Sequence, residues 1–326
     1  MPDRIVGAAL ALGLSLGCGH ALAQTWPSKP VRIIVGFSPG GGSDISARVV
    51  APALSELWDV PVLIENRPGA AGNIANEYTT RAAPDGHTLL LCSASHSVLP
   101  AREGKKLTYD PIGDFAFAAY FGGVPNVLMV HPSMPVKSLK EFIAFARARP
   151  DQINVGSAGV GGTPHMSIEL LKLVAGIKVV HVPYKGGSAA LADLISGQLE
   201  SSIGNLAGGL LGAIQSGRVR ALGVSSASRT PQLPNVPTFQ EQGIGDFDVT
   251  AWYGLCAPAK SPPAAVARIN ADVARLLGAG TPVRKRLEEQ GIDVAPPRTP
   301  EAFAGMVKAE IVKWTRVVRE AKLDWE

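Results

Sequence analysis

Residues 37–44 form the stretch of this sequence whose composition best suits the binding of an anion. The stretch reads Phe-Ser-Pro-Gly-Gly-Gly-Ser-Asp and follows an apolar run at 31–35. Three successive glycines lack Cβ atoms, so backbone N–H groups can approach a bound molecule closely. Ser43 and Asp44 favour a helix start, where free N–H groups and the helix dipole attract negative charge. The alternative interpretation is a tight strand-to-helix turn that binds nothing.

A second glycine-rich stretch, residues 156–165, has the same character. It follows a short apolar segment, and His165 lies just inside the expected helix. The His165 ring could donate a hydrogen bond to a ligand oxygen, or it could cap and pack its own turn. His165 and Glu169 stand four residues apart and could hold a metal ion, but such a pair more often marks one helix face. We expect neither a metal nor a cofactor.

Further polar candidates follow other predicted strands. Lys185, in a Pro-Tyr-Lys-Gly-Gly turn, could pair with a carboxylate or could be a solvated surface lysine. Asn205 ends a strand and could line a pocket or hold its own turn. The residues predicted to contact a ligand are Phe37, Ser38, Gly40, Gly41, Ser43, Asp44, Ser93, Ser95, Ser157, Ala158, Gly161, Thr163, His165, Lys185 and Asn205.

These strand ends hold few groups that could perform catalysis. The sequence contains neither a Walker A nor an HExxH motif. In open α/β sheets, ligands lie at the carboxyl ends of the strands. Here those ends are rich in Gly, Ser, Thr and Asn and poor in charge, which suits a carboxylate held by N–H groups, hydroxyls and water. We therefore expect a binding protein and not an enzyme.

Strands that alternate with helices must position these residues. Residues 31–97 read as strand, glycine turn and helix twice, followed by a third strand, and residues 153–205 repeat this order. Such units imply parallel sheets with right-handed crossovers, here in two α/β lobes. Too few strands follow residue 250 for a third domain, so the tail is expected to return to the first lobe. The chain then crosses between lobes near 123–126 and 247–250, which makes a hinge.

The first residues read as an export signal. An apolar run over residues 5–19 ends at Ala21-Leu22-Ala23, a small-x-small cleavage pattern, so we assign residues 1–23 to a signal peptide. The run is too short to span a membrane. Cys18 could accept a lipid, but the residues before it fit a lipoprotein signal poorly. We expect a periplasmic mature protein that starts near Gln24.

Charge and cysteine content narrow the partners and the redox state. The 326-residue chain has a formal net charge of +4, and no basic run marks a nucleic-acid interface. The mild positive excess suits a small anionic ligand. Cys92 and Cys256 remain after cleavage and form no CxxC motif. Because each lies in an apolar strand, we expect two buried reduced thiols, although a disulfide is open to them if the strands are neighbours.

Motifs along nearly the whole mature chain resemble those of the Bug family of periplasmic solute-binding receptors, the extracytoplasmic components of tripartite tricarboxylate transporters. The matching stretches are 26–32, 39–44, 65–70, 83–90, 109–111, 124–128, 162–165, 181–186, 233–238 and 252–254. Two stretches depart from the family pattern. Residues 38–41 read Ser-Pro-Gly-Gly where members often have Pro-Pro-Gly-Gly, and the loop at 93–97 is shorter than usual. The family's individual substrates therefore do not transfer.

The resemblance implies a two-lobe periplasmic-binding-protein (Venus-flytrap) fold of the α/β class with two hinge crossings. We assign residues 24–123 and 250–326 to lobe one and 124–249 to lobe two. The implied function is capture of an amino acid, a di- or tricarboxylate or an aromatic acid, and its delivery by a monomeric receptor to a membrane transporter. A ligand-sensing subunit for a membrane sensor kinase and an exported enzyme on the same scaffold are the alternatives.

Overall fold

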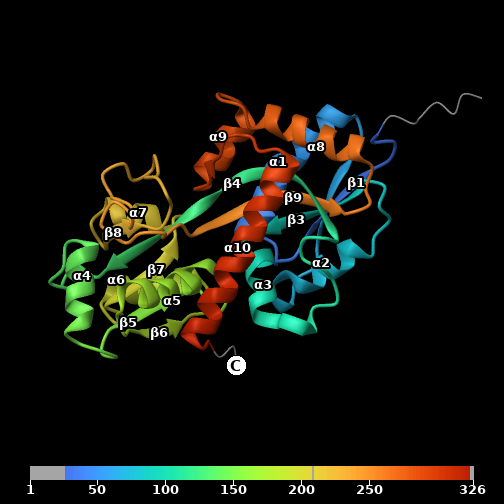
Figure 1. Ribbon diagram of the computed structural model, residues 1–326. Helices are drawn as coiled ribbons and strands as arrows, with labels where there is room; N and C mark the ends of the chain where they lie inside the picture. Colours follow the sequence, from blue (N-terminus) through green and yellow to red (C-terminus); the bar gives the residue numbers. More distant parts are fainter. Residues whose placement is uncertain (1–25, 208, 324–326) are drawn as a thin grey trace, which may run out of the picture.

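The computed structural model describes residues 26–207 and 209–323, which form two α/β lobes connected by long strands (Figure 1). The predicted signal peptide lies outside the described residues. The strand order is β2-β1-β3-β9-β4-β7-β5-β6, with β8 and β10 also paired to β4. The two-lobe α/β fold expected from the sequence is confirmed. No helix within the described ranges is both long and apolar enough to cross a membrane.

The first lobe contains a parallel sheet that the sequence predicted closely. Its elements are β1 (Val31–Val35), α1 (Gly42–Trp58), β2 (Val62–Asn66), the short 3-10 turn η1 (Ala70–Gly72), α2 (Asn73–Thr80), β3 (Thr88–Ser93), α3 (Ser95–Glu103) and the 3-10 turn η2 (Gly104–Lys106). Strand β1 pairs in parallel with β2 on one side and β3 on the other. All six residues of β3 are buried, as expected for a central strand covered on both faces.

Helix α3 corrects one expectation. The sequence predicts a loop over residues 93–97, but the helix begins at Ser95. Two serines, a histidine and the internal Pro100 make this a poor helix by intrinsic propensity. Its buried residues, which include Val98 and Leu99, pack into the core, and this tertiary packing outweighs the propensity.

Strand β4 (Phe115–Val130) runs from the first lobe into the second and forms the first hinge crossing. Its first part pairs with β9 (Thr250–Pro258), and its last part, from residue 126, pairs with β7 and β8 of the second lobe. The sequence predicts a strand only from residue 124, just after Gly122 and Gly123, which are usual strand breakers. The structure continues the strand through them, with register shifts between Phe117 and Ala119 and between Tyr120 and Gly122.

The second lobe repeats the strand and helix order of the first. Its elements are α4 (Leu139–Arg147), β5 (Asn154–Ser157), α5 (Thr163–Ala175), β6 (Val180–Pro183), α6 (Gly187–Ser196), β7 (Ser201–Asn205), α7 (Gly209–Gln215) and β8 (Arg220–Val224). At the second crossing, Thr250 and Ala251 of β9 pair with Pro125 and Val124 of β4. The two expected hinge crossings are therefore hydrogen-bonded neighbours.

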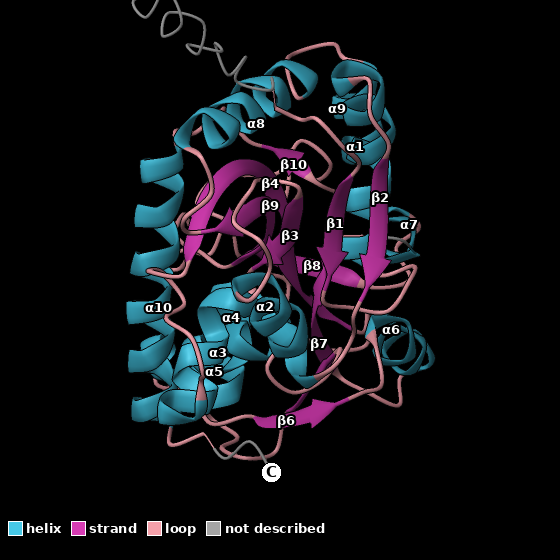
Figure 2. Ribbon diagram, turned by 90° about the vertical axis from the view of Figure 1, so that its right-hand side faces the viewer, coloured by secondary structure: helices cyan, strands magenta, loops and turns pink. Residues whose placement is uncertain are grey.

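The tail consists of α8 (Pro263–Leu276), α9 (Pro282–Glu289), β10 (Asp293–Val294) and α10 (Pro300–Ala321). Helix α10 runs along both lobes in the two perpendicular views (Figures 1 and 2). Phe303 packs with Trp252 in the first lobe, whereas Trp314 and Val317 belong to the core of the second. The assignment of residues 250–326 to lobe one stays a prediction, and α10 gives the lobes a third connection.

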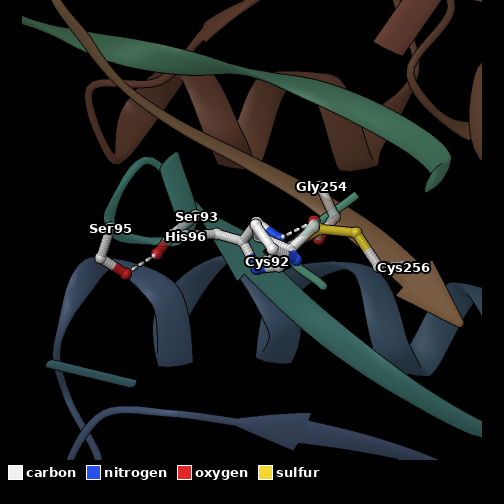
Figure 3. Close-up of a disulfide and its surroundings, with 7 residues drawn as sticks. Cys92, Ser93, Ser95, His96, Gly254 and Cys256 are labelled. Atoms are coloured by element: carbon white, nitrogen blue, oxygen red, sulfur yellow. Dashed lines mark hydrogen bonds between the residues drawn. A yellow bond between two sulfur atoms is a disulfide. The ribbon is translucent and has the colours of Figure 1, made fainter. Parts of the chain in front are cut away.

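Cys92 and Cys256 form a disulfide, so the expectation of two reduced thiols is wrong. Strands β3 and β9 are antiparallel neighbours in which Leu90 faces Cys256 and Cys92 faces Gly254. This register brings the two cysteine Cα atoms to 6.1 Å. The bond lies next to Gly254, whose carbonyl oxygen is 3.4 Å from Cys92 Sγ (Figure 3). Strand adjacency of segments 164 residues apart is a tertiary property that the apolar character of each strand does not reveal.

Candidate ligand-binding site

Both glycine turns line one cavity between the lobes. This cavity, here called the cleft cavity, has a volume of about 500 Å³. The first lobe contributes Phe37, Gly41 and Ser43, and the second contributes Gly161 and Thr163. A side cavity of about 650 Å³, lined largely by aliphatic side chains, adjoins it and shares Gly42, Ala158, Asn205 and Tyr253 with it. Among the described residues, those that line the cleft cavity include no carboxylate, so a bound anion would meet no like charge from them.

Asp44 holds the first glycine turn in shape. Its Oδ2 atom accepts hydrogen bonds from the Gly40 N–H at 2.9 Å and from Arg48 Nε at 2.8 Å, and its Oδ1 accepts from Asn66 Nδ2 at 2.9 Å. The same Asn66 amide donates to the Phe37 carbonyl at 3.0 Å. The Arg48 hydrogen bond, together with those from Gly40 and Asn66, lowers the pKa of Asp44 to about 2 against the opposing effect of burial. The ionised Asp44 carboxylate thus stabilises the conformation of the first glycine turn.

The start of α1 presents backbone to the cleft cavity. The N-cap residue is Gly41 in an extended conformation, and no side chain caps the helix. The first N–H groups of a helix point outward along its axis and favour an anion. A Cβ atom on Gly42 would lie 2.3 Å from the Tyr253 hydroxyl, so the turn needs glycine there for a close approach. Burial raises the pKa of Tyr253 to about 12, which keeps this hydroxyl protonated.

Histidines and Ser157 support the second turn. His165 Nδ1 accepts the Gly161 N–H at 3.0 Å, and its ring stacks on His181 with centroids 4.0 Å apart. The Ser157 hydroxyl lies 2.7 Å from His181 Nε2. Burial, with smaller contributions from His181 and Lys172, lowers the pKa of His165 to about 3. The imidazole is therefore neutral and accepts the turn's N–H.

A network of amides connects the cavity to the hinge strand. Asn205 Nδ2 donates to Asn126 Oδ1 at 2.7 Å and to Thr163 Oγ1 at 3.2 Å. Asn126 is fully buried in β4, at the point where this strand enters the second lobe, and its own Nδ2 donates to Ser167 at 2.8 Å. Two cavity-lining side chains are thus held in place by the element that joins the lobes.

A sequence model described as the tripartite tricarboxylate transporter family receptor matches residues 46–323. The chain belongs to this receptor family. BugT of Bordetella pertussis is 33% identical to the receptor over 304 residues, which is 91% of each chain. The expected relationship to the Bug family is confirmed.

Solved structures agree with this assignment. The structure titled R. palustris Rpa4515 with adipate is 33% identical to the receptor, with a TM-score of 0.77 over 91% of this chain and 98% of that one. MatC from Rhodopseudomonas palustris with bound malate is 34% identical, with a TM-score of 0.74 over 90% of this chain and 100% of that one. The receptor therefore has the periplasmic-binding-protein fold of solute-binding proteins.

Ten of the residues predicted to contact a ligand line one or both cavities of the receptor, and five do not. Ser38 and Lys185 are exposed at other positions on the surface. Asp44, Ser157 and His165 are buried supports of the two turns. The ten that line a cavity are Phe37, Gly40, Gly41, Ser43, Ser93, Ser95, Ala158, Gly161, Thr163 and Asn205.

Three prominent lining side chains were not predicted as contacts. Trp252 and Tyr253 follow the second crossing and line the cleft cavity. The Trp-Tyr-Gly motif beside an expected hinge is the sequence feature that could have indicated them. Arg102, on α3, also lines the cleft cavity, and nothing in its local sequence indicates this. The spacing Gly36-x-Ser38-x-Gly40 matches the hydrolase G-x-S-x-G pattern. Ser38 is exposed, however, and no histidine in the described residues hydrogen-bonds to its hydroxyl.

Two other polar clusters contain an ion pair each, Glu169 with Lys172 and Arg67 with Glu65. Glu169 lies 3.8 Å from His165 Nε2 and 2.9 Å from Lys172 Nζ, and no group of three or more potential metal ligands occurs within the described residues. A hollow of about 610 Å³ outside the cleft contains Arg67, whose guanidinium contacts Glu65 at 2.6 Å and covers the Tyr78 ring at 3.7 Å. The Arg67 guanidinium is therefore already paired with side chains of the first lobe.

Proposed function

We propose that this receptor captures a small carboxylate in the cleft cavity and delivers it to a tripartite tricarboxylate-type membrane transporter. The observation that carries the proposal is the convergence of two glycine turns, each leading into an uncapped helix start, on one cavity without carboxylates. The adipate and malate in the titles of the two related structures support the same ligand class. We further propose export through a cleaved signal peptide and action as a monomer.

Backbone donors are sufficient for useful affinity. A hydrogen bond from an N–H group to a charged oxygen contributes roughly 1.5–3 kcal/mol. A few such bonds in a site closed from water reach about −8 kcal/mol, which corresponds to micromolar affinity. The hinge formed by β4 and β9 allows the lobes to close on the ligand. With the neutral supports at Ser157 and His165, the site holds an acid by geometry and has no paired acid and base for turnover.

The test is calorimetry of the purified receptor with a panel of carboxylates, after native mass spectrometry for any acid it retains. Gly41→Val should reduce affinity at least tenfold, because Gly41 lines the cavity. Its backbone is extended, and an added Cβ would lie 3.6 Å from the Ser38 carbonyl oxygen, an ordinary contact. Gly162→Val is the matching change in the other lobe, with a Cβ 3.6 Å from Pro164 Cδ. Gly161 is unsuitable, because its φ of +81° would strain a valine.

Gly245→Val is the control, since a Cβ there meets nothing within 4 Å and the residue lines neither cavity. It should bind like the wild type. Normal binding by both cavity variants would contradict the proposed site. Recovery of a chemically changed acid after incubation would contradict a purely binding role, and a periplasmic protein that retains Met1 would contradict cleavage near Gln24.

A further inference from the structure

The side cavity next to the cleft cavity has a lining of different chemistry. It has a volume of about 650 Å³ and shares Gly42, Ala158, Asn205 and Tyr253 with the cleft cavity. Helices α1, α6, α7 and α9 lie on the same side of the molecule (Figure 2), and residues within or directly after each of them line the side cavity. A molecule held by the glycine turns can therefore extend between the lobes into the side cavity.

Aliphatic side chains of both lobes line the side cavity. Ile45 comes from α1, and Leu191 and Ile195 come from α6. All three are half-buried. Ile45 is not among the side chains that pack against the hydrophobic cores in the described part of the chain. An apolar group that covers such half-buried aliphatic surface is stabilised by about 25 cal/mol for each Å² removed from water.

The polar groups of the side cavity offer a ligand little. Arg218 is the one charged side chain in its lining within residues 26–207 and 209–323, and this arginine is exposed, with Nε donating to Ser216 Oγ at 3.2 Å. The Ser202 hydroxyl donates to the Gly156 carbonyl at 3.0 Å, and the Asn205 amide donates to two neighbouring side chains. A buried polar group without a partner is costly, so an apolar ligand group suits this space best.

We propose that the side cavity binds the hydrocarbon tail of the ligand, so that the receptor prefers monocarboxylates with a medium-length alkyl chain to short acids and to diacids of equal length. This inference rests on the proposed function and specifies the substrate class of the same receptor. The carboxylate stays at the glycine turns, and the tail passes the residues that both cavities share. Two of these, Gly42 and Ala158, are small and leave room for a chain between the lobes.

The apolar lining sets how affinity changes with the ligand. Each methylene that enters the side cavity should strengthen binding roughly fourfold, which is the equivalent of about 0.8 kcal/mol. A diacid of the same length would place its second carboxylate among aliphatic side chains, where a charge without a partner is strongly disfavoured. Affinity should therefore rise with chain length and fall when the far end of the chain is ionised.

The experiment is calorimetry of the full receptor with butyrate, hexanoate, octanoate and the eight-carbon diacid suberate. The wild type should bind octanoate at least tenfold more tightly than butyrate and at least tenfold more tightly than suberate. Ala192→Phe adds a ring at an exposed position of α6 that lines the side cavity. It should weaken octanoate at least tenfold and leave butyrate within about threefold, because butyrate is too short to fill the side cavity.

Ala189→Phe is the matched control, since Ala189 is also exposed on α6 and lines neither cavity. It should bind all four acids like the wild type. Thermal melts check folding, and Leu191→Gln, which makes the lining polar, replaces Ala192→Phe if that variant is unstable.

Three results would overturn the inference while leaving carboxylate capture intact. They are equal affinity for butyrate and octanoate, octanoate binding that the side-cavity variant leaves unchanged, and tighter binding of suberate than of octanoate. The last would show that the far end of the ligand meets a cation such as Arg218 and not an apolar lining. Failure of the wild type to bind any acid, including those of the wider carboxylate panel, would overturn the proposed function and this inference together.

Discussion

At the residue scale, two polar side chains hydrogen-bond to the backbone of their own glycine turns. Asp44 and His165 each lie four residues beyond a glycine whose N–H they accept, Gly40 and Gly161 respectively. One is a carboxylate whose pKa is lowered, and the other is an imidazole whose lowered pKa keeps it neutral. Both rigidify a turn without placing a net cation or an extra donor in the cavity. These supports leave backbone N–H groups as the hydrogen-bond donors of the proposed site.

Asp44→Asn should lower the free energy of unfolding by about 1–2 kcal/mol at pH 7, a figure that allows for screening of the exposed Arg48 partner. Because folding depresses the pKa of Asp44 from 3.8 to about 2, its contribution is present above pH 4 and is lost as pH falls toward 2. Urea unfolding at pH 7 and pH 3 measures this: the gap between wild type and variant should shrink at pH 3.

Asp59→Asn provides the control for this measurement. Asp59 is exposed just after α1 in a left-handed conformation that asparagine also adopts. It should differ little from the wild type at either pH. An Asp44→Asn gap that stays constant between pH 7 and pH 3 would show that the lost stability does not come from the ionised carboxylate.

At the element scale, the disulfide cross-links β3 and β9, two neighbouring strands that contribute residues to the lining of the cleft cavity. Strand β3 ends at Ser93, which pairs with Tyr253 of β9, and both residues line the cleft cavity. The bond between Cys92 and Cys256 closes a loop of 164 residues. Chain-entropy models assign the greatest stabilisation to such long loops. The cross-link therefore acts on stability and on the alignment of two lining residues.

Replacing both cysteines by alanine should lower the free energy of unfolding by about 2–5 kcal/mol. We expect a smaller loss of ligand affinity, because β3 and β9 remain hydrogen-bonded without the bond. Chemical denaturation and calorimetry measure the two effects. Peptide mapping of the non-reduced protein should recover Cys92 and Cys256 in one linked fragment, and two free thiols in the exported protein would contradict the assigned bond.

At the scale of the whole molecule, α10 connects the lobes through one carboxylate. Glu310 Oε2 accepts hydrogen bonds at 3.2 Å from Ser97 of α3, from Trp252 of β9 and from Trp314 of α10 itself. Lys313 hydrogen-bonds both to Glu310 Oε1 and to the Asp248 carbonyl beside the second crossing. Trp252 also lines the cleft cavity. Glu310 and Lys313 therefore connect the lining of the cleft cavity, the second crossing and the cores of both lobes.

Glu310→Gln should cost about 2–3 kcal/mol of folding stability, since hydrogen bonds to a charged acceptor contribute roughly 1.5–3 kcal/mol each and the amide recovers part of them. Ligand affinity should also fall, because the Trp252 indole loses its charged acceptor. Thermal unfolding and tryptophan fluorescence during ligand titration report the two effects. Glu320→Gln, an exposed change on the same helix, should alter neither. An unfolding temperature of Glu310→Gln equal to that of the wild type would contradict this stabilising role of Glu310.

The sequence by itself determined the elements whose signals are local. The apolar run 31–35 is the strand β1, and Ser138, in a Ser-Leu-Lys-Glu capping pattern, accepts the Glu141 N–H at the start of α4. Periodicity, capping and glycine content depend on near neighbours in the chain, so they survive in the fold. The same signals, with the spaced motifs, indicated the receptor family and the two facing turns.

Only the tertiary structure decided which side chains face the cleft and which distant segments of the chain contact one another. The Cys92–Cys256 bond joins β3 to β9, and the Tyr253 hydroxyl of β9 lies against Gly42 at the start of α1. Arg102 of α3 lines the cleft cavity together with residues of the second lobe. In each case the segments are distant in the sequence. His165 Nδ1 accepts the Gly161 N–H, a contact that the sequence position of His165 does not reveal. A polar side chain satisfies its hydrogen bonds with whatever group is nearest in space. That choice depends on packing between distant segments, which residue type and local spacing do not encode.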